Sequence, residues 1–181
     1  MTHIALLRGI NVGGNNIIRM AALKALFERM GFADVKTYIQ SGNVIFSSPI
    51  TNTKTLSRAI EKALSKEFRY VSRVLVVSEK EITRVMKEAP KGFGSKPAHY
   101  RYDVIFLFPE LSSKKAFAAM ETREGVDWLT IGAHALYSSR LIKKATQSRM
   151  AKVIMKPEYK LMTIRNWNTT KKLAGMVAKD T

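Results

Sequence analysis

Apolar residues recur along this chain in two spacings, one typical of strands and the other of amphipathic helices. Short apolar runs predict strands at 3–8, 35–40, 43–46 and 73–77. Apolar residues three or four positions apart predict helices at 20–30 and 51–68, each with one buried face. The predicted order over this part of the chain is β-α-β-β-α-β, which is the ferredoxin-like arrangement.

The same order begins again after residue 78. Ser78 and Glu81 form a capping-box pattern that predicts a short helix ending at Pro90, and a basic connector follows at 91–101. The later elements are predicted as a strand at 102–108, a helix at 112–122, two strands around Gly132-Ala133, a helix near 147–155, a strand near 161–164 and a final helix from about Thr169. Residues 35–48 also lie without a gap over 126–139, and this favours an internal duplication.

We therefore expect an α+β fold built from two ferredoxin-like halves in tandem. The expected organisation is a ferredoxin-like subdomain at 1–78, a helix and basic connector at 79–101, and a second ferredoxin-like subdomain at 102–181. Sheets that lie side by side and sheets that lie face to face both fit this order.

The amount and distribution of positive charge indicate a possible binding partner. The 181 residues carry a net charge of +17, distributed as +3 over 1–50, +6 over 51–100, zero over 101–140 and +8 over 141–181. Such segregation favours anionic partners, either nucleic acid or a phosphorylated ligand, although a basic protein without such a partner is the alternative. Lys54, Arg58, Lys62 and Lys66 recur every four residues, which predicts either a solvated helix face or a track for phosphates.

Several classes of protein and site are excluded or disfavoured by composition. The chain has no cysteine, so disulfides and thiolate metal sites are excluded. Its three histidines are isolated, and we expect no metal and no cofactor. No apolar run is long enough to cross a bilayer and no signal peptide is evident, so we expect no membrane partner and a cytoplasmic location in a bacterium. Oligomeric state is open.

Three segments rich in Asn, Gly and Arg are the candidate ligand-binding elements. The first, residues 8–16, joins a predicted strand to a helix and suits an anion, yet it matches neither G-x-G-x-x-G nor a Walker loop. The others are the hairpin tip at 41–43 and the start of the last helix at 165–168, where turn formation, capping and a core Trp167 are the alternatives. The predicted ligand-binding residues are Arg8, Asn11, Gly13, Gly14, Asn15, Asn16, Ser41, Gly42, Asn43, Arg165, Asn166, Trp167 and Asn168.

The chain also resembles a bacterial family catalogued only as a domain of unknown function. The stretches that carry the resemblance are LLRGINVGG (6–14), TYIQSGNVIF (37–46) and MTIRNWNTTKKL (162–173). The resemblance implies a two-part α+β fold with ferredoxin-like halves, and it implies no activity. Many relatives have a glycine-rich stretch before a Ser-Lys or Ser-Arg pair. The pair is matched here by Ser148-Arg149, but the preceding residues, 143–147, contain no glycine.

Two functions are compatible with these features, and whether the chain is an enzyme is open. The first is binding of an anionic ligand or a nucleic acid through a basic surface, although the aromatic signature of RNA-recognition modules is absent. The second is an enzyme or sensor for a small phosphorylated molecule at a pocket between the halves. A third possibility treats the loops as structural and the charge as incidental. The sequence favours the first.

Overall fold

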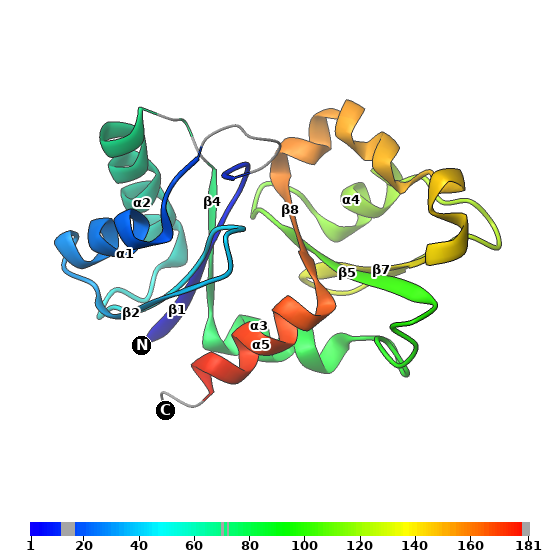
Figure 1. The fold of residues 1–181 in the computed structure, drawn as a ribbon, viewed down its shortest axis with the longest axis horizontal. Helices are drawn as coiled ribbons and strands as arrows, with labels where there is room; N and C mark the ends of the chain where they lie inside the picture. Colours follow the sequence, from blue (N-terminus) through cyan, green and yellow to red (C-terminus); the bar gives the residue numbers. More distant parts are fainter. Residues whose placement is uncertain (12–16, 70, 72, 179–181) are drawn as a thin grey trace. The chain divides into compact units, whose positions relative to one another are not determined.

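The computed structural model describes residues 1–11, 17–69, 71 and 73–178 (Figure 1). Contacts divide the chain into two compact units, of which the first is Met1–Ile82 with Leu173–Thr181 and the second is Thr83–Lys172. Each unit contains one four-stranded antiparallel sheet.

The chain passes through two similar series of elements. The first series is β1 (Thr2–Leu7), α1 (Met20–Arg29), β2 (Ala33–Tyr38), β3 (Asn43–Ser47), α2 (Thr53–Phe68), β4 (Val74–Ser78) and α3 (Glu79–Glu88). The second is β5 (Tyr100–Leu107), α4 (Ser113–Ala119), β6 (Asp127–Ile131), β7 (Ala135–Leu141), the 3₁₀ turns η1 (Ile142–Gln147), η2 (Met150–Met155) and η3 (Pro157–Leu161), β8 (Met162–Asn166) and α5 (Trp167–Val177).

In the first unit, α1 and α2 lie on one face of a sheet with strand order β2-β3-β1-β4 (Figure 1). The apolar residues that predict the helices form the core with the inward residues of the strands, because both sets must leave water to be stable. Phe27 and Phe46 meet edge to face at 5.4 Å, and Ile60 and Leu64 of α2 are fully buried in the same core.

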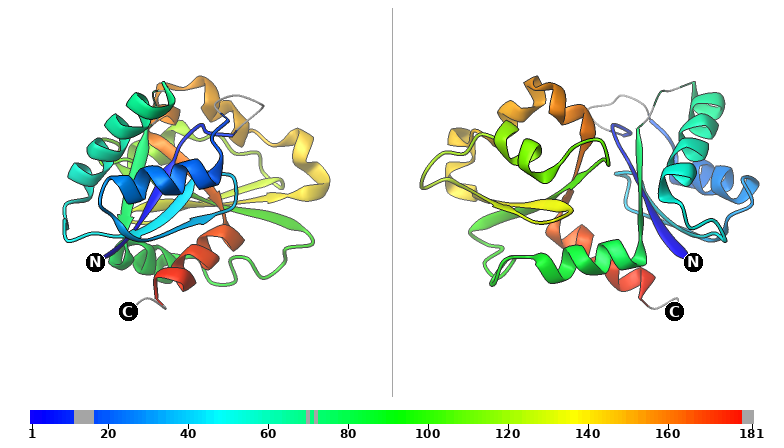
Figure 2. Two further views of the ribbon diagram at one scale, coloured as in Figure 1. Left: turned by 60° about the vertical axis from the view of Figure 1, so that its left-hand side comes forward. Right: turned by 180° about the vertical axis from the view of Figure 1, so that it is seen from behind.

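The second unit repeats this strand order as β6-β7-β5-β8, which confirms the prediction of two ferredoxin-like halves in tandem. Here α4 and the three 3₁₀ turns lie on one face of the sheet (Figure 2). Ile105, Leu136 and Met162, from three different strands, contribute to the core on that face. Tyr137 points to the other face, where its hydroxyl donates to the carbonyl of Val85 at 2.6 Å.

The two hairpins that overlay in sequence differ in register. Lys36 pairs with Ile45 in the first sheet, whereas Leu136, which overlays Ile45, pairs with Ile131. Ile131 overlays Gln40, not Lys36, so the pairing is displaced by four residues. The turns account for this difference, because Gly132 and Ala135 are bonded across a two-residue turn while β2 and β3 are joined by a longer one.

The prediction of a helix near 147–155 is wrong. Three 3₁₀ turns occupy this part of the chain, separated by extended backbone at Ser148 and Lys156. Lys156 precedes Pro157, and a residue before proline is driven out of the helical region. Val153 alone is buried in the η2 turn, so this segment lacks the continuous apolar stripe that would stabilise a longer helix.

The capping box at the start of α3 is confirmed. The Ser78 hydroxyl accepts from the backbone N–H of Glu81 at 3.3 Å, and the Glu81 carboxylate accepts from the backbone N–H of Ser78 at 2.6 Å. Both bonds satisfy donors that the helix leaves unpaired.

Replacing Ser78 with Ala should lower the free energy of unfolding by about 1 kcal/mol, because the helix loses its cap. Urea unfolding followed by circular dichroism measures the change. Ser78→Thr is the matched control, since it keeps the capping oxygen and should stay near the wild-type value. Equal stability of Ser78→Ala and wild type would contradict the role of this cap.

The buried His3 should make the stability of the protein depend on pH. Its ring is fully buried beside Phe46, and burial lowers its pKa below the ordinary 6.5, with the N-terminal ammonium acting in the same direction and Glu81 opposing them. The folded state therefore prefers the neutral ring, so this contribution is fully present above about pH 6.5 and is lost as the pH falls through the lowered pKa.

Thermal unfolding between pH 7.5 and 5 should show this loss in the wild type and a smaller one in His3→Leu. His99 is exposed, and His99→Gln should keep the wild-type pH profile. A His3→Leu profile that is parallel to the wild type would exclude His3 as the source.

Candidate functional site

The described part of the first predicted loop is held together by Asn11. Its amide nitrogen donates to the carbonyls of Ile18 at 3.0 Å and Gln40 at 2.9 Å, and its amide oxygen accepts from the N–H of Ile18 at 2.8 Å. Both amide hydrogens are thus used in closing the loop onto the β2–β3 turn. Gly13, Gly14, Asn15 and Asn16 of the prediction lie outside the described residues.

The hairpin tip at 41–43 is brought to the same place in the first unit. Gly42 accepts from the N–H of Leu7 at 2.8 Å and has a φ of 73°, and a Cβ here would meet Ile10 at 2.8 Å. Only glycine fits both the angle and the space. Asn43 is fully buried and donates to the carbonyl of Tyr38 and to the hydroxyl of Ser41, both at 3.0 Å.

The third predicted segment, 165–168, lies in the second unit. Arg165 is buried, and burial lowers its pKa to about 10; its Nη1 donates to the Thr163 hydroxyl and to the carbonyl of Ile164, both at 2.9 Å. Trp167 is 8% exposed and packs edge to face on Phe93 at 5.1 Å. The alternative of a core tryptophan is therefore what the structure shows.

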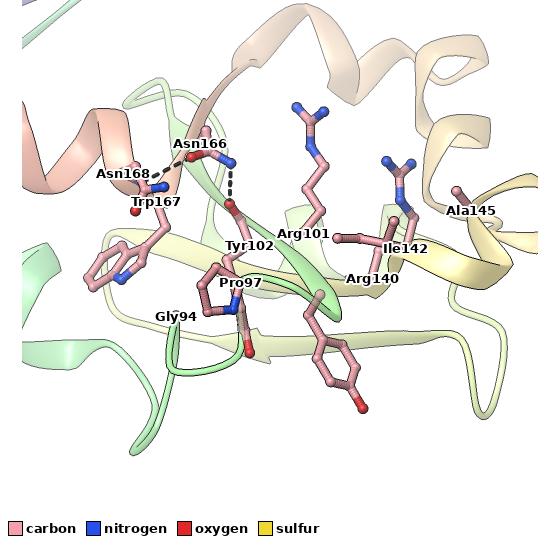
Figure 3. A pocket seen from close by; sticks show the side chains of 11 residues that line it. Gly94, Pro97, Arg101, Tyr102, Arg140, Ile142, Ala145, Asn166, Trp167 and Asn168 are labelled. Carbon is pink, nitrogen blue, oxygen red and sulfur yellow. Dashed lines mark hydrogen bonds between the residues drawn. The ribbon is translucent and has the colours of Figure 1, made fainter.

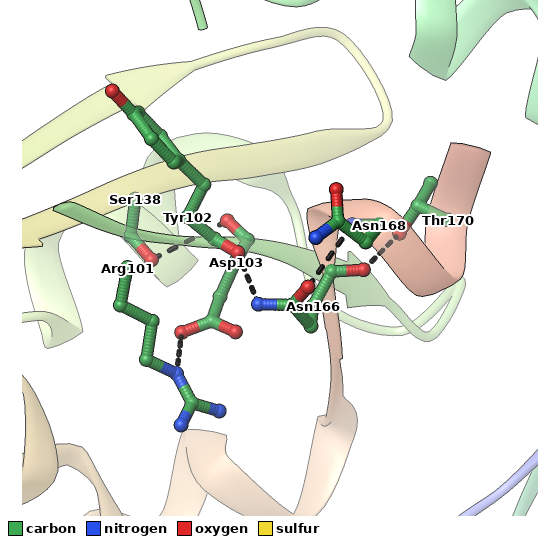
Figure 4. A network of polar contacts seen from close by, with 7 residues as sticks. All are labelled: Arg101, Tyr102, Asp103, Ser138, Asn166, Asn168 and Thr170. Carbon is green, nitrogen blue, oxygen red and sulfur yellow. Dashed lines mark hydrogen bonds and ion pairs between the residues drawn. The ribbon is translucent and has the colours of Figure 1, made fainter. Parts of the chain in front are cut away.

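The cap of the last helix is Asn166, and the helix begins at Trp167, two residues before the expected start at Thr169. The Asn166 side-chain oxygen accepts from the N–H of Asn168 at 3.0 Å, and its amide nitrogen donates to the carbonyl of Tyr102 at 3.0 Å (Figure 4). One side chain therefore caps α5 and also ties its start to β5. Asn168 is exposed.

A pocket of about 390 Å³ lies at this end of the second sheet, where β5 begins and β8 ends. Its size is that of a small-molecule site. The lining combines strand, turn and helix residues, among them Asn166, Trp167 and Asn168 of the prediction (Figure 3). The other lining residues are Gly94, Pro97, Tyr100, Arg101, Tyr102, Arg140, Ile142 and Ala145.

Two arginines of this pocket lie directly opposite each other on neighbouring strands. Arg101 of β5 pairs in register with Arg140 of β7, and their side chains run in the same direction (Figure 3). Asp103 accepts from the Arg101 Nε at 2.8 Å, and this hydrogen bond raises the pKa of Arg101 (Figure 4). The guanidinium of Arg101 therefore stays charged.

Arg140 has no comparable partner among the described residues. Its Nε is buried and has no hydrogen-bond acceptor in the described part of the chain. Asp127 is its register neighbour on β6, but the Asp127 Oδ2 accepts from the backbone N–H groups of Arg123 at 3.0 Å and Arg149 at 2.9 Å. The pocket therefore has two guanidinium groups and, within the described residues, one ion pair.

Aromatic side chains extend from the pocket across the other face of the sheet. The ring centroid of Tyr100 lies 5.4 Å from that of Trp128 and 6.1 Å from that of Tyr102. The centroids of Tyr102 and Phe93 are 5.0 Å apart. Trp128 is 43% exposed, whereas Tyr100 and Tyr102 are half-buried. Flat, partly exposed rings of this kind can stack on a ligand.

Sequence reasoning singled out Arg101 only as part of the basic connector and missed Arg140. The signal that unites them is the register between β5 and β7, which depends on pairing between segments almost forty positions apart in sequence. No metal-binding group of three His, Cys, Asp or Glu residues occurs within the described residues. No described helix is long and apolar enough to cross a membrane.

Comparisons with known proteins give a family and a solved relative. The conserved bacterial protein SP0830 from Streptococcus pneumoniae has a similar structure, with a TM-score of 0.82 and 26% sequence identity over 97% of each chain. No match was found among the curated proteins compared. Residues 1–137 match the model of a family described as a protein of unknown function, DUF1697. With three quarters of its length covered by that model, the chain belongs to the DUF1697 family.

Proposed function

We propose that the protein binds a small anionic ligand in the pocket of its second unit, with Arg101 and Arg140 as donors to a phosphate group. The observation that carries this proposal is the juxtaposed arginine pair, of which Arg140 has a buried Nε without an acceptor. Like charges directly opposite each other on neighbouring strands repel. A bound anion would offset this repulsion by lying between the two positive charges.

The guanidinium group suits this role because its planar donors match the oxygens of a phosphate in pairs. Asp103 uses the Nε of Arg101, and the ion pair leaves the Arg101 side chain 53% exposed, with its outer nitrogens available to a ligand. The start of α5 adds the positive end of a helix dipole beside the lining residue Asn168.

The aromatic lining favours a ligand that also has a flat ring, as nucleotides do. Tyr100 and Tyr102 line the same pocket as the arginines and are only half-buried. Tyr100 is the first residue of β5, so a ligand that passes around this end of the strand would place a phosphate at the arginines on one face and a ring against Tyr100 on the other. We therefore take ADP as the informative probe, with inorganic pyrophosphate as the probe for the charged part alone.

The proposal concerns binding, because the arginine pair supplies donors for an anion. Asp103 Oδ2 accepts from Arg101, and Asp127 Oδ2 accepts from two backbone N–H groups. Among the described residues, the Oδ1 atoms of both carboxylates are buried without a hydrogen-bond partner. The ligand-binding roles predicted for the first loop and the hairpin tip stay predictions.

Replacing Arg101 or Arg140 with Gln should each weaken binding of pyrophosphate and ADP by about ten- to a hundredfold. The reason is the loss of charge-assisted hydrogen bonds worth about 1.5–3 kcal/mol. Isothermal titration calorimetry measures the dissociation constants, and thermal unfolding shows whether each variant is folded. The ligand should also raise the unfolding temperature of the wild type.

Arg149→Gln is the matched control for these variants. It removes one charge from an exposed arginine of the same unit that does not line the pocket. Its affinity should stay close to that of the wild type. The proposal is wrong if all three variants lose affinity equally, or if the wild type binds neither probe at low salt.

A further inference from the structure

The outer face of α2 carries a row of four basic side chains, which we call the α2 stripe. It consists of Lys54, Arg58, Lys62 and Lys66, all of which are exposed. Residues four positions apart rise by about 6 Å along a helix, so the stripe extends for about 18 Å. It lies in the first unit, whereas the arginine pocket lies in the second.

The α2 stripe has no paired acidic residue in the part of the chain that the structure describes. Within residues 1–11, 17–69, 71 and 73–178, none of its four members forms an ion pair. The two acidic residues of α2 are engaged elsewhere: Glu61 accepts from the N–H of Val74 at 2.8 Å, and Glu67 accepts from Arg29 at 2.8 Å. Like charges at this spacing repel, so the stripe does not stabilise its own helix.

The chemistry of the surface around the stripe limits the kind of partner. None of the large hydrophobic side chains that are exposed in the described chain belongs to α2. A helix that lies on a membrane needs apolar side chains to insert, and a protein interface needs an apolar or aromatic centre. A charged and polar row without such residues suits a partner that offers regularly spaced anions.

We propose that the α2 stripe binds the phosphate backbone of a nucleic acid without regard to sequence. Lysine and arginine contacts to successive phosphates position a protein on a strand and carry no base information. The spacing of about 6 Å between stripe residues lets each one meet a different phosphate of an extended chain. This site is separate from the arginine pocket and does not depend on a ligand there.

The test is the salt dependence of binding. Fluorescence anisotropy of a labelled 20-nucleotide RNA, and of a DNA duplex of the same length, is measured between about 50 and 200 mM salt for the wild type and for a variant with all four stripe residues changed to Gln. Each phosphate contact contributes about 0.7 to the slope of log K against log salt for a single strand and about 0.9 for a duplex. The variant should therefore lose about 3 units of slope, and its affinity at 50 mM salt should fall more than tenfold.

A second variant separates the stripe from net charge. Changing the exposed Lys87, Lys91, Lys114 and Lys115 of the second unit to Gln removes the same charge and should leave the slope within one unit of the wild type. Circular dichroism confirms that both variants are folded. Equal losses in the two variants would overturn the proposal, as would the absence of salt-dependent binding by the wild type to either nucleic acid. Binding to phosphatidylserine vesicles that depends on the stripe, without binding to nucleic acid, would assign the stripe to a membrane and also overturn it.

Discussion

Arg101 and Arg140 face each other across two hydrogen-bonded strands, and the arrangement of the second unit at this end of the sheet follows from that opposition. Such a pair is unfavourable unless anions lie near it. Asp103 supplies one anion, on the same strand as Arg101 and two residues further on. Asp127 lies opposite Arg140 on β6, where its Oδ2 accepts from the N–H groups of Arg123 and Arg149 and its Oδ1 has no hydrogen-bond partner among the described residues. Among the described residues, Arg140 therefore forms no ion pair, and the pocket has two guanidinium groups with one paired carboxylate beside them.

The bonds of Asp127 also shape the pocket. By accepting from the backbone N–H of Arg149, Asp127 holds the start of η2 against the sheet, and the preceding turn, η1, contributes Ile142 and Ala145 to the pocket wall. On the opposite side, Asn166 ends β8, caps α5 and bonds to Tyr102. Both walls are therefore fixed by single polar side chains that bond to backbone groups. Rigid walls of this kind lower the entropy lost when a ligand binds.

Local sequence patterns were sufficient for most of the fold and insufficient for the site. The strand and helix spacings predicted both ferredoxin-like halves, and Ser78 with Glu81 marked the start of α3, because these signals act between neighbours in the sequence. The prediction of a helix at 147–155 is wrong because the apolar residues of this segment lack a common buried face. Arg140 could not be recognised as a pocket residue from the sequence, because its place opposite Arg101 depends on the register between β5 and β7. The displaced register of the two hairpins shows that even similar sequences can pair differently.

Several residues of the Asn-, Gly- and Arg-rich segments have structural roles in the described part of the chain, while Asn166, Trp167 and Asn168 also line the pocket. Asn11 uses both of its amide hydrogens within the first unit, Gly42 fills a position where a Cβ has no room, and Trp167 packs on Phe93. Residues that are already bonded or buried have little left to offer a ligand. Arg101, by contrast, lines the pocket with a side chain that is 53% exposed, and Arg140 lines it directly opposite on β7. Unusual composition therefore marks demanding backbone positions in this chain, while the donors best suited to an anion come from two ordinary strands.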